Sequence, residues 1–305
     1  MLDNRTNLSE QEIIENKITG NSINGHQMKQ FVEAALRWLK ANQQLVNSLN
    51  VFPVPDGDTG TNMLLTMQAA YNEIAAIDEI NIGKVTKNVA QGALMGARGN
   101  SGVILSQIWR GFARVLDNLP EMDVQLFARA LAESRNTAYK GVVRPVEGTI
   151  LTVIKDVSIA VENSASRTSD LMTVLEDAVK AADESVKYTP ELLPILKTAG
   201  VVDSGGKGLF FLLEGILRFI KGQSLDESLI AIKDITALQF SETMDGVEDG
   251  QDVEVVIDFS PHNQLDLDAF YTDLAKIGTS IQVGEGDGLY RMHIHVETDK
   301  QDEPE

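Results

Sequence analysis

Apolar residues recur at helical spacing across the first two thirds of this 305-residue chain, and that pattern limits the fold more than any other feature. Met28, Phe31, Val32 and Ala35, for example, would share one face of a helix. Further helices are predicted after a cap at Thr61 and Asn62, and over 82–94, 103–112, 124–142, 149–161, 171–186 and 209–220. Seven or eight helices, with no convincing strand before residue 222, are typical of a helical bundle or barrel.

The character of the sequence changes after residue 222. β-Branched residues at 253–259 predict a strand, 267–277 has helical spacing, and 280–283 and 290–296 predict two strands joined by a glycine-rich turn at 284–288. We therefore expect a mainly α protein with a small α+β module. Its predicted parts are a polar N-terminal arm (1–24), a helical domain (25–222), an acidic linker (223–252), the module (253–300) and a tail (301–305).

The charge balance limits the classes of partner. Forty-five acidic and 26 basic side chains give a net charge of −19, which argues against nonspecific binding to nucleic acid or to anionic lipid. Cysteine is absent, so neither a disulfide nor a thiolate metal site is expected. The first residues lack a signal-peptide pattern, and no run approaches the roughly 18 apolar residues of a membrane span. We expect a cytoplasmic protein with no integral membrane segment.

An Asp-Gly-Asp sequence is the first candidate for chemistry. Asp56 and Asp58 flank Gly57 after two prolines that hold the approach extended, so two carboxylates leave one turn close together. Unpaired like charges repel, and one carboxyl would have to keep its proton. A hard divalent cation removes that conflict, and oxygen-only ligands favour Mg²⁺ or Ca²⁺ over zinc. The alternative for an isolated Asp-Gly-Asp is an ordinary solvated turn.

Three further polar or glycine-rich turns adjoin predicted helices: 96–102 (GARGNSG), 145–151 (PVEGTIL) and 202–208 (VDSGGKG). In the first, free backbone N–H groups and the Ser101 hydroxyl would form an anion cradle that Gly99 and Gly102 open to close approach. The alternative is a helix-to-helix turn in which Ser101 only caps. A Walker-type Gly-Lys-Ser/Thr sequence is absent, so an ordinary P-loop is not expected.

In this order, the four segments resemble the ATP-binding domain of the dihydroxyacetone kinase family, and most closely its fatty-acid kinase branch. The resemblance covers residues 25–222 and implies a helical-barrel nucleotide-binding domain that uses ATP and Mg²⁺ for phosphoryl transfer. It implies Asp56 and Asp58 as metal ligands and catalytic residues. The implied nucleotide-binding residues are Asn50, Thr59, Thr61, Asn62, Asn100, Ser101, Gly102, Thr149, Asp203, Ser204, Gly205 and Gly206. Arg98 and Lys207 would either meet phosphate charge or remain solvated.

One position departs from the family's pattern. A third carboxylate commonly precedes the aspartate pair by five positions, and this chain has Val51 there. The neighbouring Asn50 would offer an amide oxygen instead. We therefore expect a metal shell that differs in charge or holds another water.

The resemblance also implies a phosphoryl acceptor. Dihydroxyacetone kinases hold their sugar on a histidine of a separate domain, and this chain shows no second large α/β domain. The resemblance favours the fatty-acid branch, in which a separate binding protein presents the acyl carboxylate and the product is an acyl phosphate. That branch normally adds a further part after the position of residue 305. The expected partners are ATP, ADP and a fatty-acid-binding protein; a homodimer stays open.

Three alternatives also stay open. The chain would be the ATP-binding component of a dihydroxyacetone-type (glycerone) kinase, or a non-catalytic regulator that binds nucleotide or lipid. The third alternative is a metal-binding scaffold, because His293 and His295 share one face of a predicted strand. In some fatty-acid kinase chains a cysteine joins such a pair to hold zinc. Without cysteine, we expect these histidines to be structural or surface residues.

Overall fold

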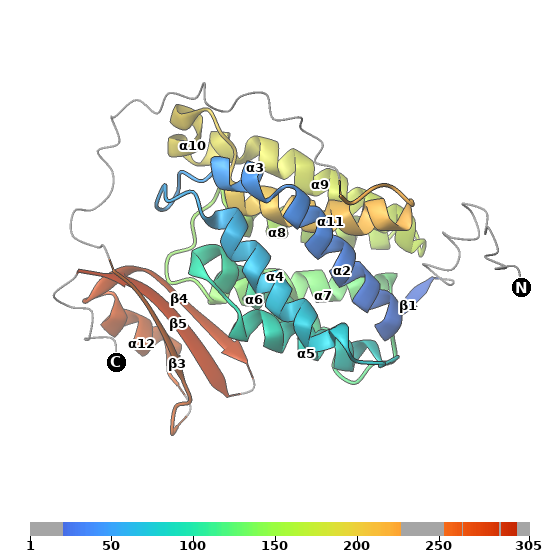
Figure 1. Cartoon of the computed structure of the whole chain (residues 1–305), viewed down its shortest axis with the longest axis horizontal. Coiled ribbons are helices and arrows are strands. Elements are labelled where there is room, and N and C mark those ends of the chain that lie inside the picture. Colours follow the sequence, from blue (N-terminus) through green and yellow to red (C-terminus); the bar gives the residue numbers. More distant parts are fainter. Residues whose placement is uncertain (1–20, 227–252, 264, 287, 298–305) are drawn as a thin grey trace, which may run out of the picture.

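The computed structural model describes residues 21–226, 253–263, 265–286 and 288–297. Figure 1 shows a bundle of helices with a small sheet packed against it. The predicted N-terminal arm and acidic linker lie mostly outside the described residues, and the tail lies entirely outside them. The boundaries of those three parts therefore stay predictions.

The helical character predicted for the first part of the chain is confirmed. Ten helices between residues 21 and 226 are α2 (Gly25–Ala41), α3 (Gln43–Ser48), α4 (Thr59–Ala75), α5 (Ile82–Met95), α6 (Gly99–Leu116), α7 (Val124–Lys140), α8 (Ile150–Ala165), α9 (Leu171–Leu192), α10 (Pro194–Ala199) and α11 (Ser204–Ile220). Asn24, Asp123 and Asp170 cap α2, α7 and α9 with their side chains, as residues of these types commonly do. None of the helices in the described ranges is both long enough and apolar enough to cross a membrane.

These helices close into a ring around one apolar core. Each long helix packs on the next along the chain, and α11 packs back on α2. Trp38, Leu39, Met63 and Met67 from the ring have essentially no exposed surface. A Cβ at Gly215 would lie only 2.7 Å from Trp38 Cβ, so this glycine lets α11 approach α2 closely. The predicted bundle or barrel is therefore a closed one.

Several predicted boundaries were wrong for local reasons. β1 (Ser22–Asn24) pairs antiparallel with β2 (Glu121–Asp123), although no strand was expected here; three residues are too few to show a strand period. α9 continues through Pro190 to Leu192, beyond the predicted end. α4 begins at Thr59 with Asp58 as its N-cap residue, so Thr61 and Asn62 lie inside the helix.

The α+β module has the predicted element order. It contains β3 (Val253–Phe259), α12 (Leu267–Leu274), β4 (Gly278–Gly286) and β5 (Leu289–Val296), with the antiparallel strand order β3-β5-β4. β4 includes Gly284 and Gly286, which the sequence indicated as a turn. A Cβ at either glycine would lie within 2.7 Å of the Leu94 side chain. These glycines therefore allow a strand to lie directly on α5 and α6.

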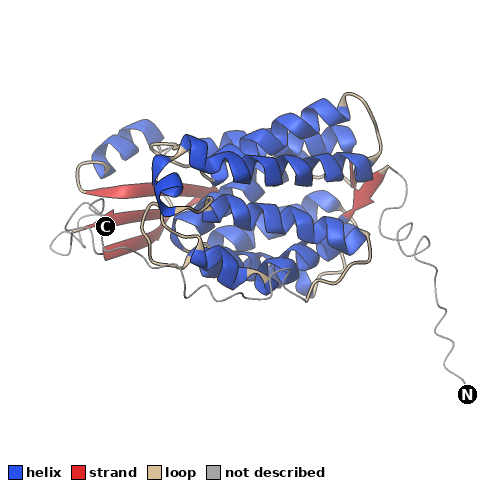
Figure 2. Cartoon of the chain, turned by 90° about the horizontal axis from the view of Figure 1, so that it is seen from above, coloured by secondary structure: helices blue, strands red, loops and turns tan. Residues whose placement is uncertain are grey.

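The module is docked on one end of the helical ring, opposite the end that carries β1 and β2 (Figure 2). Arg291 of β5 pairs with Asp258 of β3 and also donates to the carbonyl oxygens of Leu94 and Met95 at the C-terminus of α5. Arg114 of α6 forms an ion pair of 2.9 Å with Glu285 of β4. The sheet therefore lies over the end of the ring where α6 begins.

Candidate functional site

The first turns of α4, α6, α8 and α11 meet around one polar cavity of about 90 Å³ beneath the sheet. Four helix N-termini therefore direct the positive ends of their dipoles toward the same space. The cavity is lined by Asn50, Phe52, Pro53, Val54, Asp56, Asp58, Thr59, Asn62, Gly99, Asn100, Ser101, Ile104, Thr149, Ile150, Asp203, Ser204, Gly205, Glu254, His293 and His295. Such a concentration of helix N-termini is suited to an anion with several charges.

Two carboxylates face each other at the entrance of α4. Burial, and next the neighbouring Asp58, raise the pKa of Asp56 to about 6. Asn62 Nδ2 donates to Asp58 Oδ2 at 2.8 Å and so fixes that side chain. The like charges of this pair, beside the N-terminus of α4, fit a hard divalent cation that accompanies an anion.

Asn50 holds the loop that carries the aspartate pair. Its Oδ1 accepts from the backbone N–H of Thr59 at 3.1 Å and from Thr59 Oγ1 at 2.5 Å, while its Nδ2 donates to Val54 O at 2.7 Å. Both acceptor positions of this oxygen are therefore in use. Asn50 therefore fixes the loop, and its amide oxygen is occupied by hydrogen bonds from Thr59 in this structure.

The entrance of α6, where the sequence predicted an anion cradle, forms part of the cavity wall. Gly99 has φ +54°, and a Cβ there would lie 2.4 Å from Asn62 Nδ2, so glycine permits α6 to begin against α4. Asn100 Oδ1 is buried in the cavity wall with no hydrogen-bond partner among the described residues. The Ser101 hydroxyl also lines the cavity, and the N-cap residue of α6 is Arg98, which provides no side-chain cap. The interpretation of Ser101 as a mere cap is therefore wrong.

The entrances of α8 and α11 are held by caps. Thr149 Oγ1 donates to Val146 O at 2.8 Å and accepts from the backbone N–H of Leu151. Asp203 accepts from the backbone N–H of Gly206 at 2.6 Å. Complete burial raises the pKa of Asp203 to about 7, although hydrogen bonds from backbone N–H groups act in the opposite direction. Both side chains shape the cavity through the backbone they fix.

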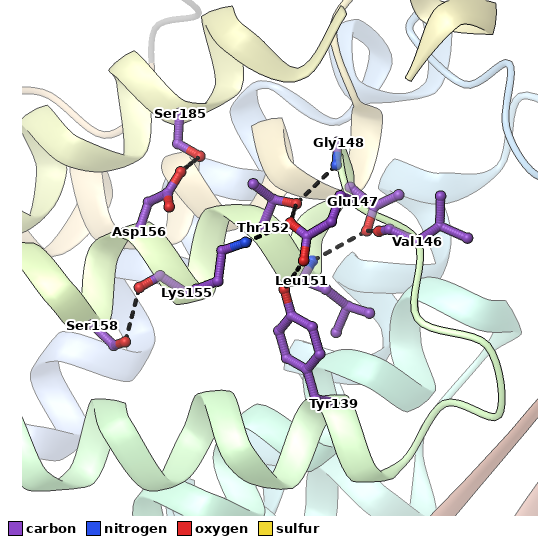
Figure 3. Close-up of polar contacts among 11 residues, drawn as sticks. Tyr139, Val146, Glu147, Gly148, Leu151, Thr152, Lys155, Asp156, Ser158 and Ser185 are labelled. Carbon is purple, nitrogen blue, oxygen red and sulfur yellow. Dashed lines mark hydrogen bonds and ion pairs between the residues drawn. The ribbon is translucent and has the colours of Figure 1, made fainter. Parts of the chain in front are cut away.

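A cluster of polar side chains supports the turn before Thr149 (Figure 3). The Glu147 carboxylate accepts from Tyr139 Oη at 2.9 Å, from Thr152 Oγ1 at 2.6 Å and from Lys155 Nζ at 2.6 Å. Thr152 Oγ1 in turn accepts from the backbone N–H of Gly148 at 2.8 Å. Burial alone would raise the pKa of Glu147, but these three donors together lower it. A charged carboxylate thus ties α7 and α8 to the turn that enters the cavity.

The module adds three residues to the cavity that the sequence did not place there: Glu254, His293 and His295. His293 is 1% exposed, and its Nδ1 lies 3.0 Å from Glu254 Oε1. Burial and His293 lower the pKa of His295, while Glu254 and Asp58 act in the opposite direction. Of the two roles expected for these histidines, structural or surface, burial rules out the surface role for His293. Within the described parts of the chain, no three His, Asp or Glu side chains are grouped so as to hold a metal ion.

A second cavity of about 250 Å³ adjoins the first and shares Phe52, Pro53, Asn100, Ile104 and Thr149 with it. Its remaining lining is mostly apolar and comes from the loop after α7 and from β4. Arg144 lies at this cavity, exposed, and Gln282 lies in its wall, buried. The two cavities form one cleft with a polar end and an apolar end.

Most of the predicted site residues are brought together in the polar cavity, with three exceptions. Thr61 Oγ1 accepts from Gln43 and Asn47 on the side of α3. Gly102 and Gly206 lie in the first turns of α6 and α11, where a Cβ would meet Thr66 and Val153 respectively. Lys207 does not line the cavity either, since its ammonium group packs over the rings of Phe210 and Phe211. For these residues the structure indicates packing.

Fold and cleft together define a closed helical ring with a polar cavity at its mouth. The sequence matches the family model of the DAK2 domain over residues 53–218, more than half of the chain. The chain therefore belongs to the DAK2-domain family, whose matched region contains nearly all of the predicted site residues.

Relatives are similar well beyond this domain. An uncharacterized protein of Staphylococcus haemolyticus is 39% identical over 283 residues, which are 90% of this chain and 51% of that protein. An uncharacterized protein of Staphylococcus aureus strain USA300 is 39% identical over 282 residues, 90% of this chain and 52% of that protein. The chain thus spans about half the length of the curated relatives that it matches.

Two crystal structures of the dihydroxyacetone kinase from C. freundii are also similar. The complex with AMP-PNP and Mg²⁺ aligns with a TM-score of 0.46 at 20% identity, over 63% of this chain and 33% of that one. The native form aligns with a TM-score of 0.45 at 18% identity, over 63% of this chain and 34% of that one.

Proposed function

We propose that this chain binds ATP with Mg²⁺ and transfers the terminal phosphoryl group to an acceptor. The observation that carries the proposal is the meeting of four helix N-termini around a cavity that also holds the Asp56 and Asp58 carboxylates. N–H groups and positive dipole ends stabilise phosphate oxygens, and the carboxylate pair supplies metal ligands. Phosphoryl transfer depends largely on such positioning and charge stabilisation.

The cleft suits the two ends of a nucleotide. We place the triphosphate in the polar cavity, with Asn100 and Ser101 at the phosphates and Asp56 and Asp58 on Mg²⁺. Bound Mg²⁺ would offset charge on the phosphate oxygens. The base would lie in the apolar end of the cleft, the cavity of about 250 Å³, because a purine ring is removed from water there. Asn100 Oδ1, unpaired where the two cavities join, would accept a hydrogen bond from the ribose.

For the acceptor, we propose a fatty-acid carboxylate presented by a separate binding protein, with an acyl phosphate as the product. The sequence resemblance to the fatty-acid kinase branch supports this choice over a glycerone-type kinase component. The described residues also contain no second large α/β domain that would hold a sugar. The cytoplasmic location predicted from the sequence is part of the same proposal.

A second candidate function is a regulator that binds nucleotide and lipid without catalysis. It is favoured by an apolar cavity of about 100 Å³ inside the ring, whose lining includes Phe31, Trp109, Phe112 and Leu213 and exposes no polar surface to it. Such a protein would bind ATP but would not consume it with any acceptor.

The test is ADP release from ATP and Mg²⁺ in the presence of a fatty-acid-loaded binding protein. We expect Asp58→Ala to reduce the rate at least 100-fold, since removal of a group that stabilises the transition state typically costs about that much. Asp78→Ala is the matched control, because Asp78 pairs with His26 at the surface, away from the cavity. Equal ADP release from the native chain and Asp58→Ala would contradict the kinase proposal. Tight ATP binding without turnover would favour the regulator.

A further inference from the structure

Strand β4 is irregular at the point where it meets the helical ring. Its pairing with β5 shifts register between Thr279 and Gln282, and Ser280 has φ +51°, an uncommon conformation for a residue other than glycine. At the same point Gln282 forms a β-bridge with Val142, and Val283 N donates to Gly141 O at 3.1 Å. Irregularities of this kind commonly re-aim a side chain next to a functional site.

The side chain that this irregularity turns toward the ring is Gln282. It is 5% exposed and lines the apolar end of the cleft. Its Oε1 has no hydrogen-bond partner in the described structure. An unpaired buried amide oxygen is unfavourable, so its position indicates a ligand that supplies a hydrogen-bond donor. Ile104, Val142 and Leu151 in the same cavity carry no donor, and the donor-bearing side chains that line it, such as Arg144, Thr279 and Ser280, do not bond to Gln282 Oε1.

We propose that the α+β module completes the nucleotide site and that Gln282 determines which base is accepted. The inference rests on the proposed ATP-binding function. With the base in the apolar cavity, Gln282 Oε1 accepts a hydrogen bond from the exocyclic amino group of adenine. A 6-oxo purine places an acceptor oxygen opposite Oε1, so it binds at the cost of turning the amide over or of repulsion between the two oxygens. The module then forms part of the pocket that selects the base.

The experiment compares the dissociation constants of MgATP and MgITP for the full chain by calorimetry, because inosine carries an oxo group in place of the adenine amino group. We expect the native chain to prefer ATP by about tenfold. Gln282→Met is close in size and cannot accept strongly, so the ATP preference should fall to about one. Gln282→Glu keeps an acceptor oxygen and should retain the preference even if both affinities fall.

Arg114→Met is the matched control at the same contact of α6 with β4, since it removes the ion pair with Glu285 outside the cavity. It should leave the ratio of the two dissociation constants unchanged. Equal weakening of ATP and ITP by Gln282→Met would overturn the assignment of Gln282 while leaving the proposed function intact. A native chain that binds neither nucleotide would overturn both.

Discussion

Ser204 Oγ donates a hydrogen bond to Thr59 Oγ1 across 3.1 Å, and this contact joins the first turn of α11 to the first turn of α4. The two residues are 145 positions apart. Thr59 Oγ1 in turn donates to Asn50 Oδ1 at 2.5 Å. These three side chains form one buried chain of hydrogen bonds, so the loop with the aspartate pair and the glycine-rich entrance of α11 are fixed relative to each other.

We predict that Thr59→Val lowers the free energy of unfolding by about 2 kcal/mol, because it removes two buried hydrogen bonds and leaves Asn50 Oδ1 short of a donor. Ser204→Ala alone should cost about 1 kcal/mol. The double variant should be little worse than Thr59→Val, since both changes break the same contact. Urea unfolding of the three variants measures this. Fully additive losses would show that the two hydroxyls do not interact.

Asp203 should make stability depend on pH. Its pKa is about 7 when folded, above the value of about 3.9 for an unfolded chain. The folded protein therefore binds more protons between pH 4 and pH 7, and this residue's contribution to stability is lost as the pH rises through that window. Asp203→Asn keeps a capping side chain and removes the titration. Its stability relative to the native chain should rise steadily from pH 4 to pH 7.

Chemical unfolding at pH 4.5, 6 and 8 follows this difference. Asp170→Asn is a control whose stability difference should change with pH in the opposite direction. Hydrogen bonds from Thr173 lower the pKa of this exposed N-cap residue. The stability that Asp170 contributes is present at neutral pH and is lost on acidification. If the Asp203→Asn difference were the same at all three pH values, burial would not raise the pKa of Asp203.

Glu147 is predicted to position the turn before Thr149. Glu147→Ala removes the acceptor shared by Tyr139, Thr152 and Lys155, so the turn should loosen and the affinity for MgATP should fall about five- to tenfold. The cost in stability should be about 1 kcal/mol, because the pair with Lys155 is partly exposed. Calorimetry with MgATP measures the affinity. Glu191→Ala, which breaks a surface pair with Lys197, should change neither quantity.

Arg291→Ala should release the module from the ring. The side chain is 11% exposed and joins Asp258 to the carbonyl oxygens at the end of α5, so its removal breaks the contact that bridges the sheet and the ring. Amide hydrogen exchange should speed up in β4 and β5 while the cores of α2 and α11 stay protected. Lys276→Ala, on the exposed side of the module, is the control. Unchanged exchange in the sheet would mean that the glycine contacts of β4 alone hold the module.

The helical ring was predictable because its helices have long one-sided apolar patterns, as α5 and α7 do. Helix starts were less predictable where glycines occur. Gly99 and Gly205 suggested turns, yet each lies in the first turn of a helix, where lack of a side chain serves close approach. The cavity residues on α4, α6, α8 and α11 were found because each belongs to a local motif.

The contribution of the module to the site was not predictable from local patterns. Glu254 reaches the cavity only because β3 pairs with β5, which places it opposite His295 in the sheet. Gln282 is aimed by a register shift and by the docking of β4 on the loop after α7. Both positions depend on contacts between segments far apart in sequence, which the local sequence pattern does not predict.

The guanidinium group of Arg291 in β5 bonds both to Asp258 of β3 and to the carbonyl oxygens at the end of α5. The end of α5 lies four residues before Gly99, where α6 begins. A cation at a helix C-terminus is favourable, so this grip is electrostatically reinforced. A displacement of β3 would therefore reach the backbone just before the first turn of α6, which lines the polar cavity. The sheet and the mouth of the ring are thereby mechanically coupled.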